Sequence, residues 1–496
     1  MSGDSITLVS PSREHITLAL ADKALTISTS NDTSSSCFPC FSLLSGQNGH
    51  FVVPYRQVIN AIFNSSDGIL EVLYLAKKQK TKKYSLFRCA GSLHEGQEKL
   101  VFQWIERLMY SAYEGAGVKR SRRLRVLVNP RGGKGKAVSI YAKKLAPIFL
   151  AAGCILDVTM TTHSGHAYEI AKEISVIDYD VLVTVSGDGL VHEAMNGFAD
   201  HENPRLAFSI PVAPIPTGSG NALALNLLGI EDGFDVVVAA LNTIKGMPMQ
   251  VDAFSVVQGG KRYLSFMSQA MGLMADLDIG TEHLRWMGDT RFFAGLLYGI
   301  MLHKPCPVRL SYKVAESDKA KMVENLKIRR ASVREPISKR ASGTSDELFS
   351  DELPPLKYST DDNEGWTTLE EPIMYVYAGK GPYVGRDYMA FPVSLPDDGL
   401  IDIMALRLTK RLDMVRAIAD GPSGESFWHP RLVYVKAHAY RVQPVRNHGT
   451  LSVDGEAKPF EDFQVEVHPK LATLLSLYGY YKAEFPANES RAAEEC

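Results

Sequence analysis

Between residues 120 and 250 the chain alternates short apolar runs with amphipathic stretches, and this alternation constrains the fold more than any other feature. The apolar runs have the length of strands, and the intervening segments have helical spacing. The expected strands are Leu124–Val128, Ile155–Met160, Val181–Val185 and Leu206–Ile215, and the expected helices are Ala137–Ala152, His166–Ser175, Leu190–Phe198 and Asn221–Leu228. This order predicts a three-layer α/β domain with a parallel sheet between crossover helices.

Three glycine-rich segments follow strands of this region and precede helices. They are Asn129-Pro-Arg-Gly-Gly-Lys-Gly-Lys-Ala137, Ser186-Gly-Asp-Gly189 and Pro216-Thr-Gly-Ser-Gly-Asn221. Ligands of open α/β sheets bind beyond the carboxyl ends of the strands, where glycine lets backbone N–H groups approach phosphate oxygens. The segments match neither a P-loop, which needs glycine at Pro130 and a hydroxyl at Ala137, nor a dinucleotide fingerprint. They predict a nucleotide phosphate site of another type.

Asp188 stands between two of these glycines at the end of an expected strand. A carboxylate there can accept the proton of an attacking hydroxyl, and phosphoryl transfer needs little else besides positioning and charge neutralisation. The alternative is that Asp188 caps the helix that follows it. His192, one helical turn later, is interpreted as structural rather than catalytic.

Changes of pattern divide the chain into four parts. Residues 1–116 hold strands and then one helix, which fits a pleckstrin-homology-like regulatory module as well as a plain extension of the core. Residues 120–250 form the nucleotide-binding catalytic domain, and residues 251–482 return to strands, which predicts an antiparallel β-sandwich. Inside the sandwich, residues 313–370 are polar and are expected to be disordered, and residues 484–496 form a polar tail.

Composition excludes several classes of protein. The formal net charge is -2, so no overall field attracts nucleic acid. Six scattered cysteines fit a reducing, cytoplasmic compartment better than a disulfide framework. The N-terminus lacks the pattern of a secretory signal, and the apolar runs are shorter than the roughly 20 residues that span a bilayer. Any association with an intracellular or plasma membrane is therefore expected to be peripheral.

Together with Ser452-Val-Asp-Gly-Glu456, the three glycine-rich segments resemble the catalytic domain of diacylglycerol-kinase-type lipid kinases, and most closely that of sphingosine (sphingoid long-chain base) kinases. The resemblance covers roughly residues 120–310 and 372–482. It implies an enzyme that uses ATP and Mg²⁺ to phosphorylate the primary hydroxyl of a sphingoid base, giving the 1-phosphate, with Asp188 as general base. The long N-terminal module and the 313–370 insertion resemble the fungal and plant enzymes.

The resemblance also assigns site residues. Those expected at ATP are Asn129, Pro130, Arg131, Gly132, Gly133, Thr161, Thr162, His163, Ser164, Gly165, Ser186, Gly187, Gly189, Glu193, Gly218, Ser219, Gly220, Arg285, Arg291, Asp454, Gly455 and Glu456. Asp188 and Asp278 are expected at the lipid substrate, where the Asp278 carboxylate suits a protonated amine. The apolar stretch Phe292–Leu302 is expected beside the lipid tail.

Three other functions remain open at this level. A kinase for ceramide or diacylglycerol has a neutral head group, which would not reward a carboxylate at Asp278. An NAD kinase shares a Gly-Asp-Gly core, and a catalytically silent lipid-binding protein would keep the fold alone. The expected partners are the sphingoid base and a membrane surface, and a second copy of the chain in a homodimer is a further candidate. Ser332 and Ser342 follow basic residues and are candidates for phosphorylation.

Overall fold

The computed structural model describes residues 4–11, 13–29, 50–93, 98–133, 135–280, 295, 299–333, 352–359, 362, 364–446 and 448–485. The chain forms two compact units, each considered by itself. Unit 1 comprises Met1–Arg125, Ser139–Asp157 and Asp235–Met247, and unit 2 comprises Val126–Val138, Val158–Phe234 and Pro248–Cys496. No helix within the described ranges is both long and apolar enough to cross a membrane.

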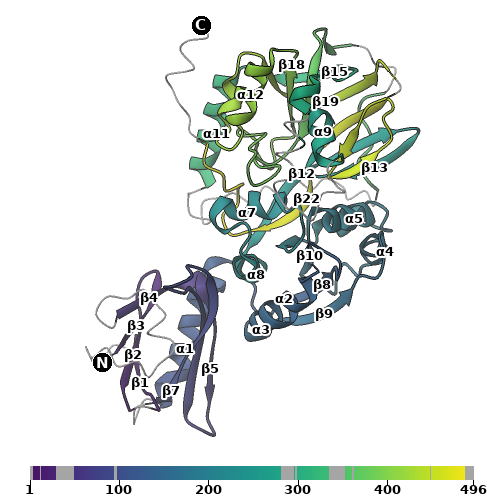
Figure 1. Ribbon diagram of the computed structural model, residues 1–496. Coiled ribbons are helices and arrows are strands. Elements are labelled where there is room, and N and C mark those ends of the chain that lie inside the picture. The colour runs from purple at the N-terminus through teal and green to yellow at the C-terminus, as the bar shows by residue number, and fades with distance from the viewer. Residues whose placement is uncertain are drawn as a thin grey trace. The chain divides into compact units, whose positions relative to one another are not determined.

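Unit 1 is built on an antiparallel sheet that has seven strands in the described part of the chain (Figure 1). The strands are β1 (Ser5–Val9), β2 (His15–Leu20), β3 (Ala24–Thr29), β4 (His50–Pro54), β5 (Val58–Asn64), β6 (Ile69–Lys77) and β7 (Tyr84–Leu93), in the order β4-β3-β2-β1-β7-β6-β5. Helix α1 (Glu98–Ala112) follows and buries Val101, Trp104 and Leu108, which recur at helical spacing. The predicted succession of strands and one helix is confirmed.

Two later segments also belong to unit 1. They supply a π-helical turn at Tyr141–Leu145, helix α3 (Ala146–Ala151) and helix α8 (Val236–Lys245). The last residue of α8, Lys245, is buried, donates its Nζ proton to Ala112 O at 2.8 Å and lies 3.0 Å from the centre of the Tyr113 ring. Burial, and next the charge of Arg122, lower the pKa of Lys245 to about 6.

Unit 2 contains a mixed sheet that joins the two domains expected from the sequence. The main path through its described strands runs β21-β20-β14-β17-β18-β19-β22-β11-β10-β8-β9, and β12, β13, β15 and β16 are attached to this path. Strands β10 and β11 are parallel, and β22 pairs with β11 in parallel at Val212 and Leu474 but with β19 in antiparallel. The predicted parallel α/β sheet and antiparallel β-domain are both confirmed, and β22 makes them continuous. The sequence did not indicate this joint.

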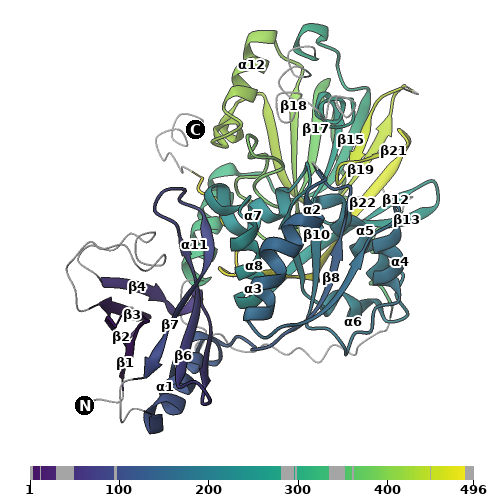
Figure 2. The same ribbon diagram turned by 60° about the horizontal axis from the view of Figure 1, so that its bottom comes forward.

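Unit 2 and its borders with unit 1 contain the following elements, and most of those between residues 120 and 250 lie close to their predicted bounds. The strands are β8 (Arg123–Val128), β9 (Ile155–Met160), β10 (Val181–Ser186), β11 (Val212–Pro216), β12 (Met247–Gln258), β13 (Lys261–Ser265), β14 (Ser268–Gly272), β15 (Val308–Glu316), β16 (Thr367–Leu369), β17 (Ile373–Gly379), β18 (Ile401–Arg407), β19 (Leu432–Pro444), β20 (Leu451–Val453), β21 (Glu456–Lys458) and β22 (Phe463–Ser476). The helices are α2 (Ala137–Ile140), α4 (His166–Lys172), α5 (Asp188–Ala199), α6 (Pro204–Ser209), α7 (Ala222–Asp232), α9 (Leu273–Asp278), α11 (Lys319–Val333) and α12 (Arg411–Ala419). Helices α4 and α5 lie side by side (Figures 1 and 2), and α5 also contacts β10.

One predicted strand is wrong over half its length. A strand was expected at Leu206–Ile215, but its first residues belong to α6 and β11 starts only at Val212. Pro204 occupies the first turn of α6, where its missing N–H costs nothing, and Pro211 separates helix from strand. The apolar residues of α6 that suggested a strand are instead a buried helix face.

The expectation of disorder in residues 313–370 is wrong for the part that is described. Helix α11 buries Met322, Val323 and Leu326, so its polar composition belongs to the outer face. Further on, Glu466 of β22 accepts hydrogen bonds from the backbone N–H groups of Lys357 at 2.7 Å and Tyr358 at 3.1 Å. These partners lie far away in the sequence, so local composition could not reveal them.

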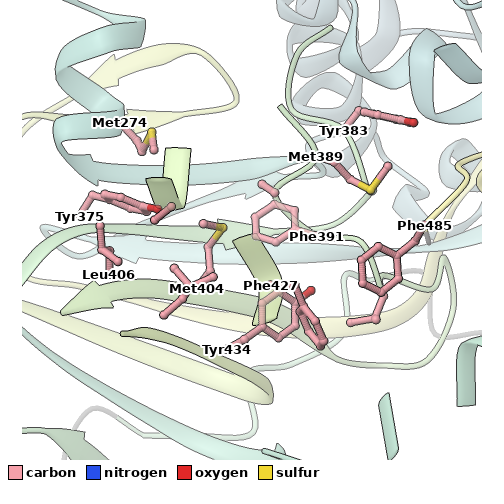
Figure 3. Close-up of a cluster of buried hydrophobic side chains, with 14 of the residues drawn as sticks. Met274, Tyr375, Tyr383, Met389, Phe391, Met404, Leu406, Phe427, Tyr434 and Phe485 are labelled. Carbon is pink, nitrogen blue, oxygen red and sulfur yellow. The ribbon is translucent and has the colours of Figure 1, made fainter. Parts of the chain in front are cut away.

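Among the described residues, two apolar clusters lie in the core of the β-domain. The first, called here the α12 cluster, joins residues of α9, α11, α12, β17 to β19 and the 3-10 helix Glu425–Trp428. It includes Met274, Tyr375, Met404 and Phe427 (Figure 3). Phe485 also packs in it, so one residue of the segment expected to be a polar tail is part of this core. The second cluster includes Phe254, Met271 and Val435.

A buried ionic network also holds the β-domain together. Lys380 Nζ lies 2.6 Å from Asp252 Oδ2 and 2.5 Å from Asp398 Oδ1, and Lys436 Nζ lies 2.9 Å from Asp398 Oδ2. Burial alone would raise the pKa of Asp398, but the two lysines lower it to about 2. Such a network holds the loop before β18 in place. Removing either partner would leave a buried charge uncompensated, which is strongly destabilising.

Candidate active site

The three glycine-rich segments converge at the carboxyl ends of the parallel strands. A Cβ atom on Gly133 would lie 2.3 Å from Thr217 O, and one on Gly187 would lie 2.3 Å from Gly220 O. A Cβ on Gly218 would likewise lie 2.3 Å from Gly187 N. These glycines are therefore required for the segments to pack backbone against backbone, in addition to any approach of phosphate.

Polar side chains fix the first and third segments. Asn129 Oδ1 accepts a hydrogen bond from Arg131 N at 2.9 Å, and Asn129 Nδ2 donates to Ser186 Oγ at 3.3 Å. In the third segment Asn221 Oδ1 accepts from Gly218 N at 3.1 Å, while Asn221 Nδ2 donates to Gly218 O at 2.9 Å. Each segment is a closed turn before its helix begins, as expected of a preorganised phosphate site.

Asp188 is buried where the second and third segments meet. Its Oδ2 accepts a hydrogen bond from Ala222 N at 2.7 Å and its Oδ1 accepts one from Leu223 N at 3.1 Å. These N–H groups open helix α7, so the Asp188 side chain caps α7, while Asp188 itself is the first residue of α5. The carboxylate is held by the positive end of α7.

The loop Thr161–Gly165 closes the same edge of the sheet. Thr161 N donates to Val128 O at 2.8 Å, and Thr162 N donates to His166 Nδ1 at 3.1 Å. His163 and Ser164 are exposed, whereas Thr161 is buried. Glu193 Oε2 accepts from Ala167 N at 3.2 Å, so this carboxylate is engaged at the start of α4.

The turn between β20 and β21 carries Asp454, Gly455 and Glu456 to this region. A Cβ on Gly189 would lie 3.3 Å from Glu456 Oε1, so the exposed Glu456 side chain reaches the segment that contains Asp188. Asp454 has a left-handed backbone conformation, with φ of 49°. The C-terminal domain thus contributes a carboxylate beside the nucleotide-binding domain.

The Asp454 carboxylate is buried and accepts five hydrogen bonds from the protein. Ser265 Oγ donates at 2.7 Å, and the backbone N–H groups of Phe266, Met267 and Ser268 donate at 3.1, 3.0 and 2.9 Å. The fifth donor is a histidine of α5. Burial, and next the charge of Asp454, raise the pKa of the neighbouring Tyr263 to about 12. The five donors to the Asp454 carboxylate are therefore all groups of the protein interior.

His192 is the fifth donor and makes the connection between α5 and the C-terminal domain. Its Nδ1 lies 2.8 Å from Asp454 Oδ2, and because a carboxylate accepts, Nδ1 is assigned the proton. One turn later, Asn196 Oδ1 accepts from Leu264 N at 2.9 Å and Asn196 Nδ2 donates to Leu264 O at 3.0 Å. This latch, defined as His192, Asn196 and Asp454, was missed from the sequence, although the four-residue spacing of His192 and Asn196 on one helix face was a usable signal.

Several expected site residues lie outside the described residues. Arg285 and Arg291 are among them, as are most of Phe292–Leu302 and Ser342. Asp278 is the last residue of α9, and its side chain is likewise outside the description. Ser332 lies near the end of α11.

The comparisons with known proteins agree with this architecture. The family model described as "Diacylglycerol kinase catalytic domain" matches residues 123–256, and the one described as "YegS C-terminal NAD kinase beta sandwich-like domain" matches residues 354–476. Residues 8–114 match a "Domain of unknown function (DUF7493)". The chain therefore carries a catalytic domain of the diacylglycerol kinase type, followed by the β-domain that belongs with it.

Curated relatives narrow this class. "Sphingoid long chain base kinase 4" of Schizosaccharomyces pombe is 30% identical over 450 residues, covering 88% of this chain and 90% of the relative. "Sphingosine kinase 1" of Arabidopsis thaliana is 28% identical over 388 residues, covering 72% of this chain and 76% of the relative. "Sphingosine kinase 1" of Homo sapiens is 28% identical over 371 residues, with 72% and 91% covered. The chain belongs to the sphingoid long chain base kinase family.

A solved structure supports the fold independently. The crystal structure of a putative diacylglycerol kinase from Bacillus anthracis str. Sterne superposes with a TM-score of 0.50 at 19% identity, covering 73% of this chain and 97% of that chain. At this identity the likeness supports the fold and not the substrate.

Proposed function

We propose that this enzyme transfers the γ-phosphoryl group of ATP to the primary hydroxyl of a sphingoid long-chain base. Membership of the sphingoid long chain base kinase family supports the reaction and the substrate class. The observation that carries the site assignment is the buried Asp188 carboxylate, fixed by two N–H groups of α7 where the glycine-rich segments meet. A carboxylate so placed can receive the hydroxyl proton as the oxygen attacks phosphorus.

The roles of the other residues follow from their positions. The segments Asn129–Gly133, Ser186–Gly189 and Gly218–Gly220 would bind phosphate oxygens through backbone N–H groups, since all three lie at helix N-termini. The loop Thr161–Gly165 would border the nucleotide, with Glu193 holding its start on α4. Asp454 would act by positioning the turn that presents Glu456.

Mg²⁺ is the metal that such a reaction requires, and the residues present fit it. Within the described ranges, no group of three or more His, Cys, Asp or Glu side chains is arranged to hold a metal ion. Kinase Mg²⁺ is typically bound by one or two carboxylates together with phosphates and waters. Glu456 is the carboxylate at this place that would contribute, which leaves Asp188 to accept the proton. When bound, Mg²⁺ would neutralise the developing phosphate charge.

The α12 cluster is the proposed site of the lipid tail. The cluster is rich in thioethers and aromatic rings, and the thioethers of Met274, Met389 and Met404 can adapt their packing to a flexible chain (Figure 3). Met274 lies in this cluster, whereas Met271 lies in the second one. Asp278 ends the helix that carries Met274, which suits a contact with the protonated amine at the head of the same lipid.

The remaining assignments are proposals of the same kind. Arg285 and Arg291 would bind transferring phosphate, because guanidinium groups fit its oxygens. Peripheral association with a membrane surface in the cytoplasm follows from the substrate being a membrane lipid. Homodimer formation and phosphorylation at Ser332 or Ser342 stay predictions.

The direct test of the proposed reaction is a substrate panel. Purified protein with labelled ATP and Mg²⁺ should phosphorylate sphingosine, dihydrosphingosine or phytosphingosine at least about 100-fold faster than ceramide or diacylglycerol, because the neutral heads gain nothing from Asp278. Preferred labelling of ceramide, diacylglycerol or NAD would reject the substrate class. Labelling of none by protein that binds ATP would favour a silent lipid-binding protein.

A further inference from the structure

The outer face of helix α12 is apolar where a surface helix is normally polar. Its inner residues Met414 and Ala417 are buried in the α12 cluster. On the opposite side Leu412 is 73% exposed and Val415 is 43% exposed. Helix α12 lies at the periphery of unit 2 (Figure 2). A soluble surface helix usually places charges there, so two exposed aliphatic residues on one short helix call for an explanation.

A second segment extends this apolar surface. Arg411 Nε donates to Ile300 O at 3.2 Å, and Arg411 Nη2 donates to Met301 O at 3.1 Å. His303 Nε2 lies 2.7 Å from Thr409 O, which holds the two segments together. Met301 is 66% exposed, and Leu302 and Leu408 are each 40% exposed. We define the α12 patch by the following residues: Met301, Leu302, Leu408, Leu412 and Val415.

Cations predominate around the α12 patch. The segments 299–304 and 407–416 contain five Lys or Arg residues, which are Lys304, Arg407, Lys410, Arg411 and Arg416, against one acidic residue, Asp413. Asp413 forms an exposed pair with Arg416 at 3.4 Å, and Arg407 lies 3.2 Å from Glu371. The charge that remains is positive, although the whole chain is slightly negative. Aliphatic side chains among cations are the composition that binds anionic lipid surfaces.

The α12 patch and the α12 cluster are opposite faces of one helix. Ile300 and Ile418 pack against the cluster, and their neighbours Met301 and Val415 are exposed. If the cluster holds the lipid tail, as proposed above, the wall of that site reaches the surface at the α12 patch. A membrane lying on the patch would present its lipids beside this wall.

From this arrangement we propose that the α12 patch is the surface by which the enzyme docks on an anionic bilayer, and that docking delivers the lipid substrate. Only the delivery of the lipid substrate rests on the proposed function; docking on the bilayer does not. Leu412 and Val415 enter the interfacial region, and Lys304 and Lys410 contact anionic head groups. A protein partner or a second copy of this chain would be recognised by a different result in the test below.

The test is co-sedimentation of the full chain with vesicles of phosphatidylcholine alone and of phosphatidylcholine containing about 30% phosphatidylserine. The parent should prefer the anionic vesicles. The double variant Leu412→Gln/Val415→Thr should lose about tenfold or more in partitioning, because short helices bind interfaces through few apolar residues. The double variant Lys304→Gln/Lys410→Gln should lose the preference for anionic lipid and its dependence on salt. Ile177→Gln, which changes an exposed aliphatic residue elsewhere in unit 2, is the matched control and should bind as the parent does.

Activity separates docking from catalysis. With substrate presented in detergent micelles, Leu412→Gln/Val415→Thr should keep the parental rate, whereas with substrate in anionic vesicles it should fall with binding. Unchanged vesicle binding in this variant would overturn the proposal. So would sedimentation velocity showing a parental dimer that the variant converts to monomer, since the patch would then join two copies. If no substrate is phosphorylated at all, the proposed function fails while the binding result still decides docking.

Discussion

Asp454 is a buried carboxylate whose hydrogen-bond partners in the structure all come from the protein. The Asp-Gly-Glu motif predicted that it lies at the site, and Glu456 does reach the segment around Asp188. The sequence could not show that five protein donors surround Asp454, because they come from α5, β13, β14 and the link between these two strands. A carboxylate satisfied in this way fits the proposed positioning role better than direct contact with the nucleotide.

The latch predicts coupling between His192 and Asp454. Asp454→Asn should lower the free energy of unfolding by about 3 kcal/mol, because an amide cannot accept all five hydrogen bonds, and His192→Phe should lower it by about 1 to 2 kcal/mol. The double variant should show a coupling energy of about 1 kcal/mol in urea unfolding. Additive losses would contradict the latch. If Asp454→Asn greatly lowered ATP affinity without lowering stability, Asp454 would be assigned to direct nucleotide binding.

Lys245 predicts a pH dependence of stability. Its pKa is lowered to about 6 in the folded chain by burial, whereas an unfolded lysine titrates near 10.4. Between these values the unfolded chain binds the additional proton, so this group makes stability rise with pH by about 1.4 kcal/mol per pH unit. The free energy of unfolding should therefore rise more steeply from pH 7 to 9 in the parent than in Lys245→Met. Equal slopes in the two proteins would show that Lys245 is charged when folded.

At the scale of elements, the alternation of strands and helices was predictable and the contacts between elements were not. The periodicities that identify β10 or α5 are local, so the sequence displays them. Helix α6 was mistaken for a strand because its buried face is a short apolar run, which has no distinctive period. Asp188 was expected either as base or as cap of its own helix, and it caps α7 because the second and third glycine-rich segments touch.

That contact between segments predicts the effect of adding one methyl group. Gly187→Ala would bring Cβ to 2.3 Å from Gly220 O, which forces the segments apart, so activity should be lost and stability should fall by more than about 1 kcal/mol. Gly189→Ala is the matched control, because its Cβ would meet only the end of the Glu456 side chain at 3.3 Å. Thermal unfolding should leave Gly189→Ala near the parent. Equal stability of the Gly187→Ala protein and the parent would mean that the segments are not packed as described.

At the scale of the whole molecule, the sequence predicted which domains exist but not how the chain connects them within unit 2. Strand β22 is read locally as a strand of the β-domain, yet it also pairs with β11 of the nucleotide-binding domain. The segment expected to be disordered includes α11, whose apolar residues find partners only after folding. The exposed charged residues of α11 outnumber these buried apolar residues, so the local composition is polar.

The central claim is that Asp188 accepts the substrate proton at the junction of the glycine-rich segments. It is tested most directly by single-turnover phosphorylation of sphingosine, with ATP affinity measured in parallel, for the parent and Asp188→Asn. The account predicts a loss of about 10²- to 10⁴-fold in the rate of phosphoryl transfer, as removal of a general base produces, while ATP affinity changes by less than about tenfold. Asp188→Asn protein that is folded and transfers phosphate at a near-parental rate would contradict the claim.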